Sequence, residues 1–199
     1  MSICRFVFVI LLLSLFSGPL TAAEKLSLAS LFTDHAVLQR EMPVPVWGWA
    51  EPNAKVTVEF AGQSKEATAD KYGAWAVKLD ALKAEEKGQT LTVKTGETTL
   101  TKTDVLVGEV WVCSGQSNMG WSLKQSEGGD KAIAAAADNG LRLFNASARA
   151  IDEPQTTIGG AWAVDSSASA ANFSGVAYFF GVDLRKALGV PVGLIKSAV

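Results

Sequence analysis

The residues best suited to chemistry lie in the segment Gly108-Glu-Val-Trp-Val-Cys-Ser-Gly-Gln-Ser-Asn-Met119. Its first half is a short run with β-branched and aromatic residues, typical of a buried strand, and the polar residues after Cys113 end that run abruptly. Gly115 relieves the crowding of a tight turn, so Ser117 is expected to project its hydroxyl from the carboxyl end of the strand. Open α/β sheets bind ligands at that end. Ser117 is therefore the candidate nucleophile, and Ser114, at the strand end, is the weaker alternative.

A serine hydroxyl becomes a good nucleophile when a base removes its proton, and the usual base is a histidine. The only histidine in the sequence is His35, which lies far ahead of Ser117 and directly after Asp34. Nothing in the sequence directs it toward the serine. We interpret His35 as an exposed loop residue, with a catalytic Asp34–His35 pair as the alternative.

The block Ser114-Gly-Gln-Ser-Asn-Met119, preceded by Gly-Glu-Val-Trp and followed by Trp121, resembles the first block of the sialate O-acetylesterase family. This family belongs to the SGNH hydrolases. The similarity covers the chain after residue 23, including Leu31–Arg40 and Pro43–Trp49, but only an N-terminal portion of the family's length. It implies that Ser117 is the nucleophile of an esterase that removes O-acetyl groups from sugars, and that the catalytic histidine lies in a later part of the family's sequence.

Four further observations bear on the site around Ser117. An oxyanion needs hydrogen-bond donors, and the Ser117 N–H is one candidate. Gln116 and Asn118 are polar neighbours that can bind the substrate or the oxyanion, with stabilisation of the turn as the alternative. Trp121 can stack on a sugar ring, with core packing as the alternative, and Trp111 is the weaker candidate. We expect no metal site and no cofactor, because one histidine and one cysteine after residue 23 make no convincing ligand set.

Before position 108 the sequence is typical of an all-β domain. Period-2 stretches alternate with short turns, which predicts an immunoglobulin-like β-sandwich over residues 24–107. Its tryptophans are interpreted as core residues. The stretches are Val44–Trp49, Lys55–Phe60, Ala74–Leu79 and Thr90–Lys94, and the tryptophans are Trp47, Trp49 and Trp75.

After position 108 the pattern becomes that of an α/β domain. A helix is expected over Asp130–Asn139, with Asp130 as its N-cap and Gly140 as its stop. A second helix should begin at Ser174 and end at Gly189. With strands at 109–113, 141–144 and 192–195, residues 108–199 are expected to form the N-terminal part of a truncated parallel-sheet domain of SGNH or flavodoxin-like type. The apolar positions of the second helix are Val176, Phe179, Phe180, Leu184, Ala187 and Leu188.

Residues 1–23 have the three-part layout of a secretory signal, with Arg5 before an apolar run and small residues up to Ala23. We expect cleavage near Ala23, export to the periplasm or beyond, and no stable membrane anchor, with an uncleaved anchor as the alternative. The net charge is −2, and no basic stripe suggests a nucleic-acid partner. Cys113 is expected to be a buried apolar residue, and the oligomeric state is left open.

Three hypotheses of function follow. The first is an exported carbohydrate O-acetylesterase that works through an acyl-serine, acting on sialic acid or, as in acetylxylan-type esterases, on an acetylated polysaccharide. The second is a secreted carbohydrate-binding module. The third is an inactive fragment, since the chain has a nucleophile without a base near it.

Overall fold

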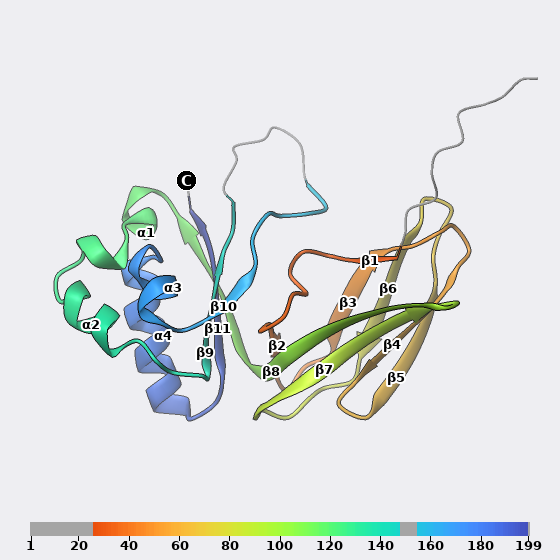
Figure 1. Ribbon diagram of the computed structural model, residues 1–199, viewed down its shortest axis with the longest axis horizontal. Coiled ribbons are helices and arrows are strands. Elements are labelled where there is room, and N and C mark those ends of the chain that lie inside the picture. Colours follow the sequence, from red (N-terminus) through yellow and green to blue (C-terminus); the bar gives the residue numbers. More distant parts are fainter. Residues whose placement is uncertain (1–25, 148–154, 199) are drawn as a thin grey trace, which may run out of the picture.

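The computed structural model describes residues 26–147 and 155–198, so the predicted signal segment lies outside the described residues. Its strands form a three-stranded sheet in the order β1-β3-β6 and an eight-stranded sheet in the order β10-β9-β11-β8-β7-β4-β5, with β2 also pairing to β8. Figure 1 shows these sheets, with helices covering the end that holds β9 and β11. The strands are β1 (Ser27–Leu28), β2 (Val37–Gln39), β3 (Val44–Trp49), β4 (Lys55–Phe60), β5 (Gln63–Thr68), β6 (Ala74–Leu79), β7 (Glu85–Thr95), β8 (Thr98–Gly115), β9 (Leu141–Asn145), β10 (Trp162–Val164) and β11 (Val192–Ala198).

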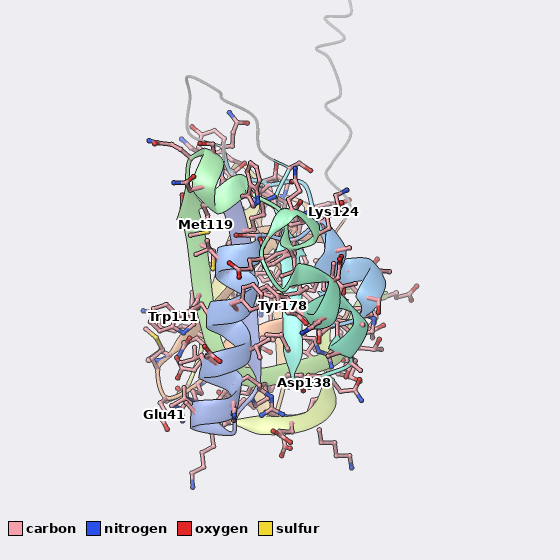
Figure 2. All side chains as sticks on the ribbon, turned by 90° about the vertical axis from the view of Figure 1, so that its left-hand side faces the viewer. Glu41, Trp111, Met119, Lys124, Asp138 and Tyr178 are labelled. Carbon is pink, nitrogen blue, oxygen red and sulfur yellow. The ribbon has the colours of Figure 1, made fainter. Side chains whose placement is uncertain are left out.

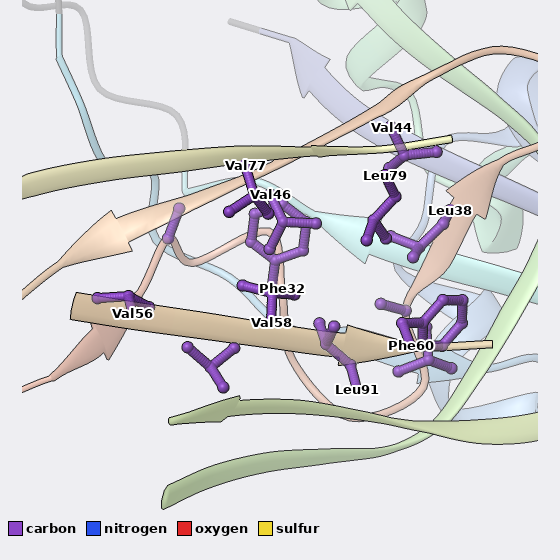
Figure 3. Close-up of a cluster of buried hydrophobic side chains, with 14 of the residues drawn as sticks. Phe32, Leu38, Val44, Val46, Val56, Val58, Phe60, Val77, Leu79 and Leu91 are labelled. Atoms are coloured by element: carbon purple, nitrogen blue, oxygen red, sulfur yellow. The ribbon is translucent and has the colours of Figure 1, made fainter. Parts of the chain in front are cut away.

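Three of the N-terminal strands, β3, β4 and β6, each bury one face. In β4, Val56, Val58 and Phe60 are buried while the residues between them are not, as expected for a strand with one face on a core. Figure 3 shows these side chains opposite those of β3 and β6, among them Val46 and Leu79. Two sheets therefore pack around a shared core, as the sequence predicts, and the immunoglobulin-like type stays a prediction.

The three tryptophans of this part lie on different faces of the small sheet. Trp75 is buried, and its indole lies over Gly48, where an added Cβ would come within 2.8 Å of Trp75 Cζ2. Trp47 and Trp49 alternate with the buried residues of β3 and are only half-buried. The prediction of a core position holds for Trp75. Trp47 and Trp49 pack against the core cluster but are only partly buried, because alternation places them on the opposite face of β3.

One strand joins the two predicted parts of the chain. The first half of β8 pairs antiparallel with β7, and its second half, from Glu109 to Gly115, pairs parallel with β11. The predicted boundary between residues 107 and 108 thus falls inside a continuous strand. Because β8 belongs to both halves, the sheet behind Ser117 is held by the N-terminal core.

The second half contains the predicted parallel strands but also an antiparallel one. β9, β11 and β8 are parallel neighbours, while β10 pairs antiparallel with β9, so the sheet is mixed rather than parallel throughout. The helices are α1 (Ser117–Gly120), the 3₁₀ turn η1 (Leu123–Gln125), α2 (Gly129–Ala135), α3 (Ser167–Ala171) and α4 (Gly175–Leu188). Within the described ranges, no helix is long and apolar enough to cross a membrane.

The helix ends agree with the sequence for α4 and differ for α2. Ser174 caps α4 by accepting a hydrogen bond from the Ala177 N–H, and Gly189 ends the helix in the left-handed conformation, as predicted. In α2 the N-cap is Gly128 rather than Asp130, which lies in the first turn, and the helix ends at Ala135.

The buried face of α4 is not the one that the large apolar residues predict. Tyr178 and Gly181 are buried, whereas Val176, Phe179 and Phe180 are exposed. A Cβ at Gly181 would come within 2.4 Å of Leu194 Cδ1, so the glycine allows α4 to lie directly on β11. Close contact of the helix backbone with the sheet therefore decided which face is buried.

Candidate active site

Ser117 lies just past the carboxyl end of β8, as the sequence predicts. It is the first residue of α1, two residues after the last residue of the strand, and it is exposed. The neighbouring parallel strand β11 ends level with it, because Ala198 is the register partner of Gly115. Ser117 is therefore at the edge where parallel strands present their ligand-binding loops. Ser114 still belongs to β8, paired with Ser197.

Gly115 and Met119 shape this turn. Gly115 has φ 154°, a conformation that side-chain-bearing residues rarely adopt, and a Cβ there would come within 3.2 Å of Met119. Met119 packs against a second apolar cluster, which lies between the helices and the sheet and includes Cys113, Leu123, Phe173 and Leu194. The Met119 sulfur accepts a hydrogen bond from Ser174 Oγ at 3.4 Å. Ser174 is fully buried and also caps α4. The turn that carries Ser117 is thus fastened to the start of α4 (Figure 2).

The two polar neighbours of Ser117 are open to solvent. Gln116 occupies the N-cap position of α1, but its side chain makes no capping hydrogen bond. Gln116 and Asn118 are exposed, and none of the described residues hydrogen-bonds to their side chains or to the Ser117 hydroxyl. Within the part of the chain that the structure describes, their side-chain amides make no hydrogen bond to the turn and face solvent.

Trp121 and Trp111 lie in different surroundings. Trp121 directly follows α1 and is 53% exposed. Its indole Nε1 donates a hydrogen bond to the Gln125 carbonyl at 2.9 Å, which holds the ring at the surface. Trp111 is four residues before the end of β8 and packs edge-to-face on Phe180 at 5.2 Å. Of the two, Trp121 is the one beside the serine turn.

An open apolar surface extends along β8 and α4. Within the described residues, the β8 stretch from Glu109 to Gly115 is paired with another strand on one side only, by β11. Trp111 is 44% exposed, Val112 is 66% exposed, and Phe180 on α4 lies beside Trp111. The strand that leads to Ser117 thus has an unpaired edge with apolar side chains next to it.

The only histidine contacts the first half of β8, far from the carboxyl end that leads to Ser117. His35 Nδ1 is 2.7 Å from Asp104 Oδ2, and Asp34 accepts hydrogen bonds from the N–H and hydroxyl of Thr103. Eleven residue steps along β8 separate Asp104 from Gly115, a span of about 36 Å at roughly 3.3 Å per step. A catalytic Asp34–His35 pair is therefore incompatible with this structure, because neither residue reaches Ser117.

Asp104 instead joins His35 to a buried arginine. Arg142 in β9 is 3% exposed and donates to Asp104 Oδ2 at 2.6 Å, while its Nε donates to the Asn139 carbonyl at 3.0 Å. Burial raises the pKa of Asp104, but the hydrogen bonds from Arg142 and His35 outweigh it, so the pKa lies below its ordinary value of 3.8. This cluster connects the N-terminal segment, β8 and β9, and the sequence contains no motif that predicts it.

Three other ionisable groups, Cys113, Asp165 and Tyr178, lie outside the serine turn. Cys113 is a buried thiol whose pKa is raised by burial, as expected for an apolar packing residue. Asp165 is 5% exposed and accepts a hydrogen bond from the Tyr178 hydroxyl at 3.1 Å; burial raises the pKa of both groups.

The chain is similar in sequence to known esterases. No family model matches the chain. Sialate O-acetylesterase of Rattus norvegicus is 33% identical over 189 residues, covering 85% of this chain and 35% of that protein. The mouse enzyme is 32% identical and covers 96% of this chain and 39% of its own length.

The fold is also similar to that of a solved acetylesterase structure. A carbohydrate acetylesterase from Xanthomonas citri has a TM-score of 0.83 and 42% identity, over 86% of this chain and 40% of that one. The chain therefore spans between 35% and 40% of the length of these relatives. On these similarities in sequence and structure, the chain belongs to a sialate O-acetylesterase-like family.

Proposed function

We propose that this protein is a carbohydrate O-acetylesterase that uses Ser117 as its nucleophile. The observation that carries the proposal is the position of Ser117: its hydroxyl is exposed, without a partner among the described residues, on a glycine-dependent turn at the carboxyl end of β8. The relatives named above are acetylesterases. A serine in this position is suited to attack on an ester carbonyl.

In the proposed reaction the Ser117 oxygen attacks the carbonyl carbon of an O-acetyl group. The sugar oxygen leaves with a proton, and an acetyl-serine remains until water hydrolyses it and restores the hydroxyl. The Ser117 N–H, at the start of α1, is a candidate donor to the developing oxyanion, and Gln116, Asn118 and Trp121 are candidates for contact with the sugar.

The base in this reaction is proposed to come from polypeptide outside the described residues. His35 is excluded because it contacts Asp104 in the first half of β8, far from Ser117. The unpaired edge of β8 and the exposed Trp111, Val112 and Phe180 offer an apolar surface on which further polypeptide can pack beside Ser117. We propose that residues packed there complete the site, and that this chain alone is an incomplete enzyme.

We also propose that residues 1–23 direct export of the protein, and that the N-terminal strands support the catalytic part and do not themselves take part in the reaction. The N-terminal strands support the serine turn through β8, whose first half is anchored in their core. The substrate is an acetylated sugar, either a sialic acid or a unit of a polysaccharide.

The test is release of acetate by the protein expressed from its complete reading frame, with O-acetylated sialic acid and acetylated xylan as substrates. Ser117→Ala should abolish turnover, whereas Ser114→Ala, on the neighbouring strand residue, should retain most of it. Equal loss in both variants, or turnover retained by Ser117→Ala, would contradict the proposed nucleophile. The ratio of the rates on the two substrates distinguishes the sialate and polysaccharide alternatives.

A further inference from the structure

We infer that the outer face of β3 and β6 is a second, non-catalytic binding site for the neutral sugar rings of a polysaccharide. This goes beyond the proposed esterase activity, because it uses neither Ser117 nor the end of β8. The floor of the site consists of Trp47 and Trp49, two alternate residues of β3 that face the same way.

The small residues opposite these tryptophans leave their rings accessible. In the register of the sheet, Trp47 pairs with Ala76 and Trp49 pairs with Ala74, and both alanines are exposed. A hollow of about 560 Å³ lies over these four residues. Larger side chains in β6 would project into this hollow beside the indoles, so the pairing of tryptophan with alanine keeps the hollow open.

The hollow continues past Trp49 toward a polar rim. A second hollow of about 380 Å³ shares Trp49 and Thr156 with the first and is also lined by Ser27, Ser30 and Thr157. One edge of the aromatic floor thus carries hydroxyl groups that can donate and accept hydrogen bonds. An apolar floor with a few polar groups at its border is the usual composition of a small-molecule site.

A sugar ring matches this arrangement. A pyranose presents an apolar C–H face that can lie on an indole, while its hydroxyls point outward to a polar rim. Two indoles at alternate positions of one strand are about 7 Å apart, within the span of two linked sugars. A chain of sugar rings can therefore contact both rings at once.

The charge of the lining decides which sugars fit. None of the residues that line either hollow is charged. A sialic acid carries a carboxylate, and transferring it to a surface without a cation would cost part of its hydration. A neutral polysaccharide loses no charge solvation, so the site should prefer neutral sugar rings over sialylated ones.

The rings are not simply part of the core. Trp47 packs edge-to-face on Phe32 at 4.9 Å, which holds it in place from one side. Both tryptophans touch the core cluster while remaining half-buried, in contrast to Trp75, which is 3% exposed. Packing on one side makes the platform rigid and reduces the entropy cost of binding.

The test is affinity electrophoresis of the chain in gels that contain xylan, acetylated xylan or no polysaccharide, with sialyllactose as a soluble competitor. Both xylans should retard the protein saturably, and sialyllactose should not release it. Ala74→Glu and Ala76→Glu place a charged side chain beside Trp49 and Trp47 while leaving the tryptophans in the fold, and each should weaken binding about tenfold or more.

The matched control is Ser64→Glu, at an exposed position of β5 away from both hollows, which should bind like the wild type. Circular dichroism of each variant verifies the fold. Binding by Ser117→Ala should also be unchanged, so that loss of esterase activity and loss of this site are separate results. Absence of saturable binding to xylan, unchanged binding in folded Ala74→Glu and Ala76→Glu, or release by sialyllactose would overturn the inference.

Discussion

Replacing Asp104 by asparagine would leave the buried guanidinium of Arg142 without its carboxylate. Removing one partner of a buried ion pair costs about 3–5 kcal/mol, because the remaining charge is left uncompensated. Arg142 is 3% exposed but the Asp104 side chain is 35% exposed, so water can reach part of the site and the cost should lie at or below the lower end of this range. We expect the free energy of unfolding to fall by about 2–3 kcal/mol, which is about 4–12 °C in Tm for a chain of this size.

The dependence on pH gives this prediction its sharpest test. The pKa of Asp104 is lowered in the folded protein, so the pair contributes stability above the ordinary value of 3.8, and that contribution is lost as the pH falls through the folded pKa. Urea unfolding followed by tryptophan fluorescence should show a large gap in the free energy of unfolding between wild type and Asp104→Asn at pH 6, and this gap should narrow as the pH falls below 3.8. Asp80→Asn, which removes an exposed pair with Lys65, is the control and should cost at most about 1 kcal/mol. A gap no larger than that of the control, or one independent of pH, would refute the reasoning.

Two further predictions concern the second apolar cluster and the support of the serine turn. The Cys113 thiol is buried and its pKa is raised by burial. A thiol reagent at pH 8 should therefore modify Cys113 far more slowly in the folded protein than in the urea-unfolded protein, and equal rates would contradict its burial. Ser174→Ala removes the cap of α4 and should lower the free energy of unfolding by about 1 kcal/mol, whereas Ser64→Ala at an exposed position should have almost no effect; an equal change in both would show that the cap does not stabilise the helix.

Local signals in the sequence predicted the serine turn and the ends of α4. Gly115, Ser174 and Gly189 each have a backbone conformation or capping bond that depends on the residue itself and its nearest neighbours. The parallel pairing of β8, β9 and β11 also follows from the alternation of strands and helices.

Long-range contacts decided the features that the sequence did not predict. The exposed apolar residues of α4 and its buried Gly181 depend on how closely the helix approaches Leu194. The contact of His35 with Asp104 joins residues 69 positions apart, and neither has a local signal. The outward direction of Trp47 and Trp49 depends on which face of β3 meets the core, and composition alone does not give this.

The measurement that tests the central claim most directly is mass spectrometry of the protein, expressed from its complete reading frame and quenched in acid during turnover of an O-acetylated sugar. One acetyl group should be found on Ser117, in the peptide that follows β8. Ser117→Ala should form no adduct and release no acetate. Acetate release without an adduct dependent on Ser117, or an acetyl group on another residue during turnover, would contradict that claim.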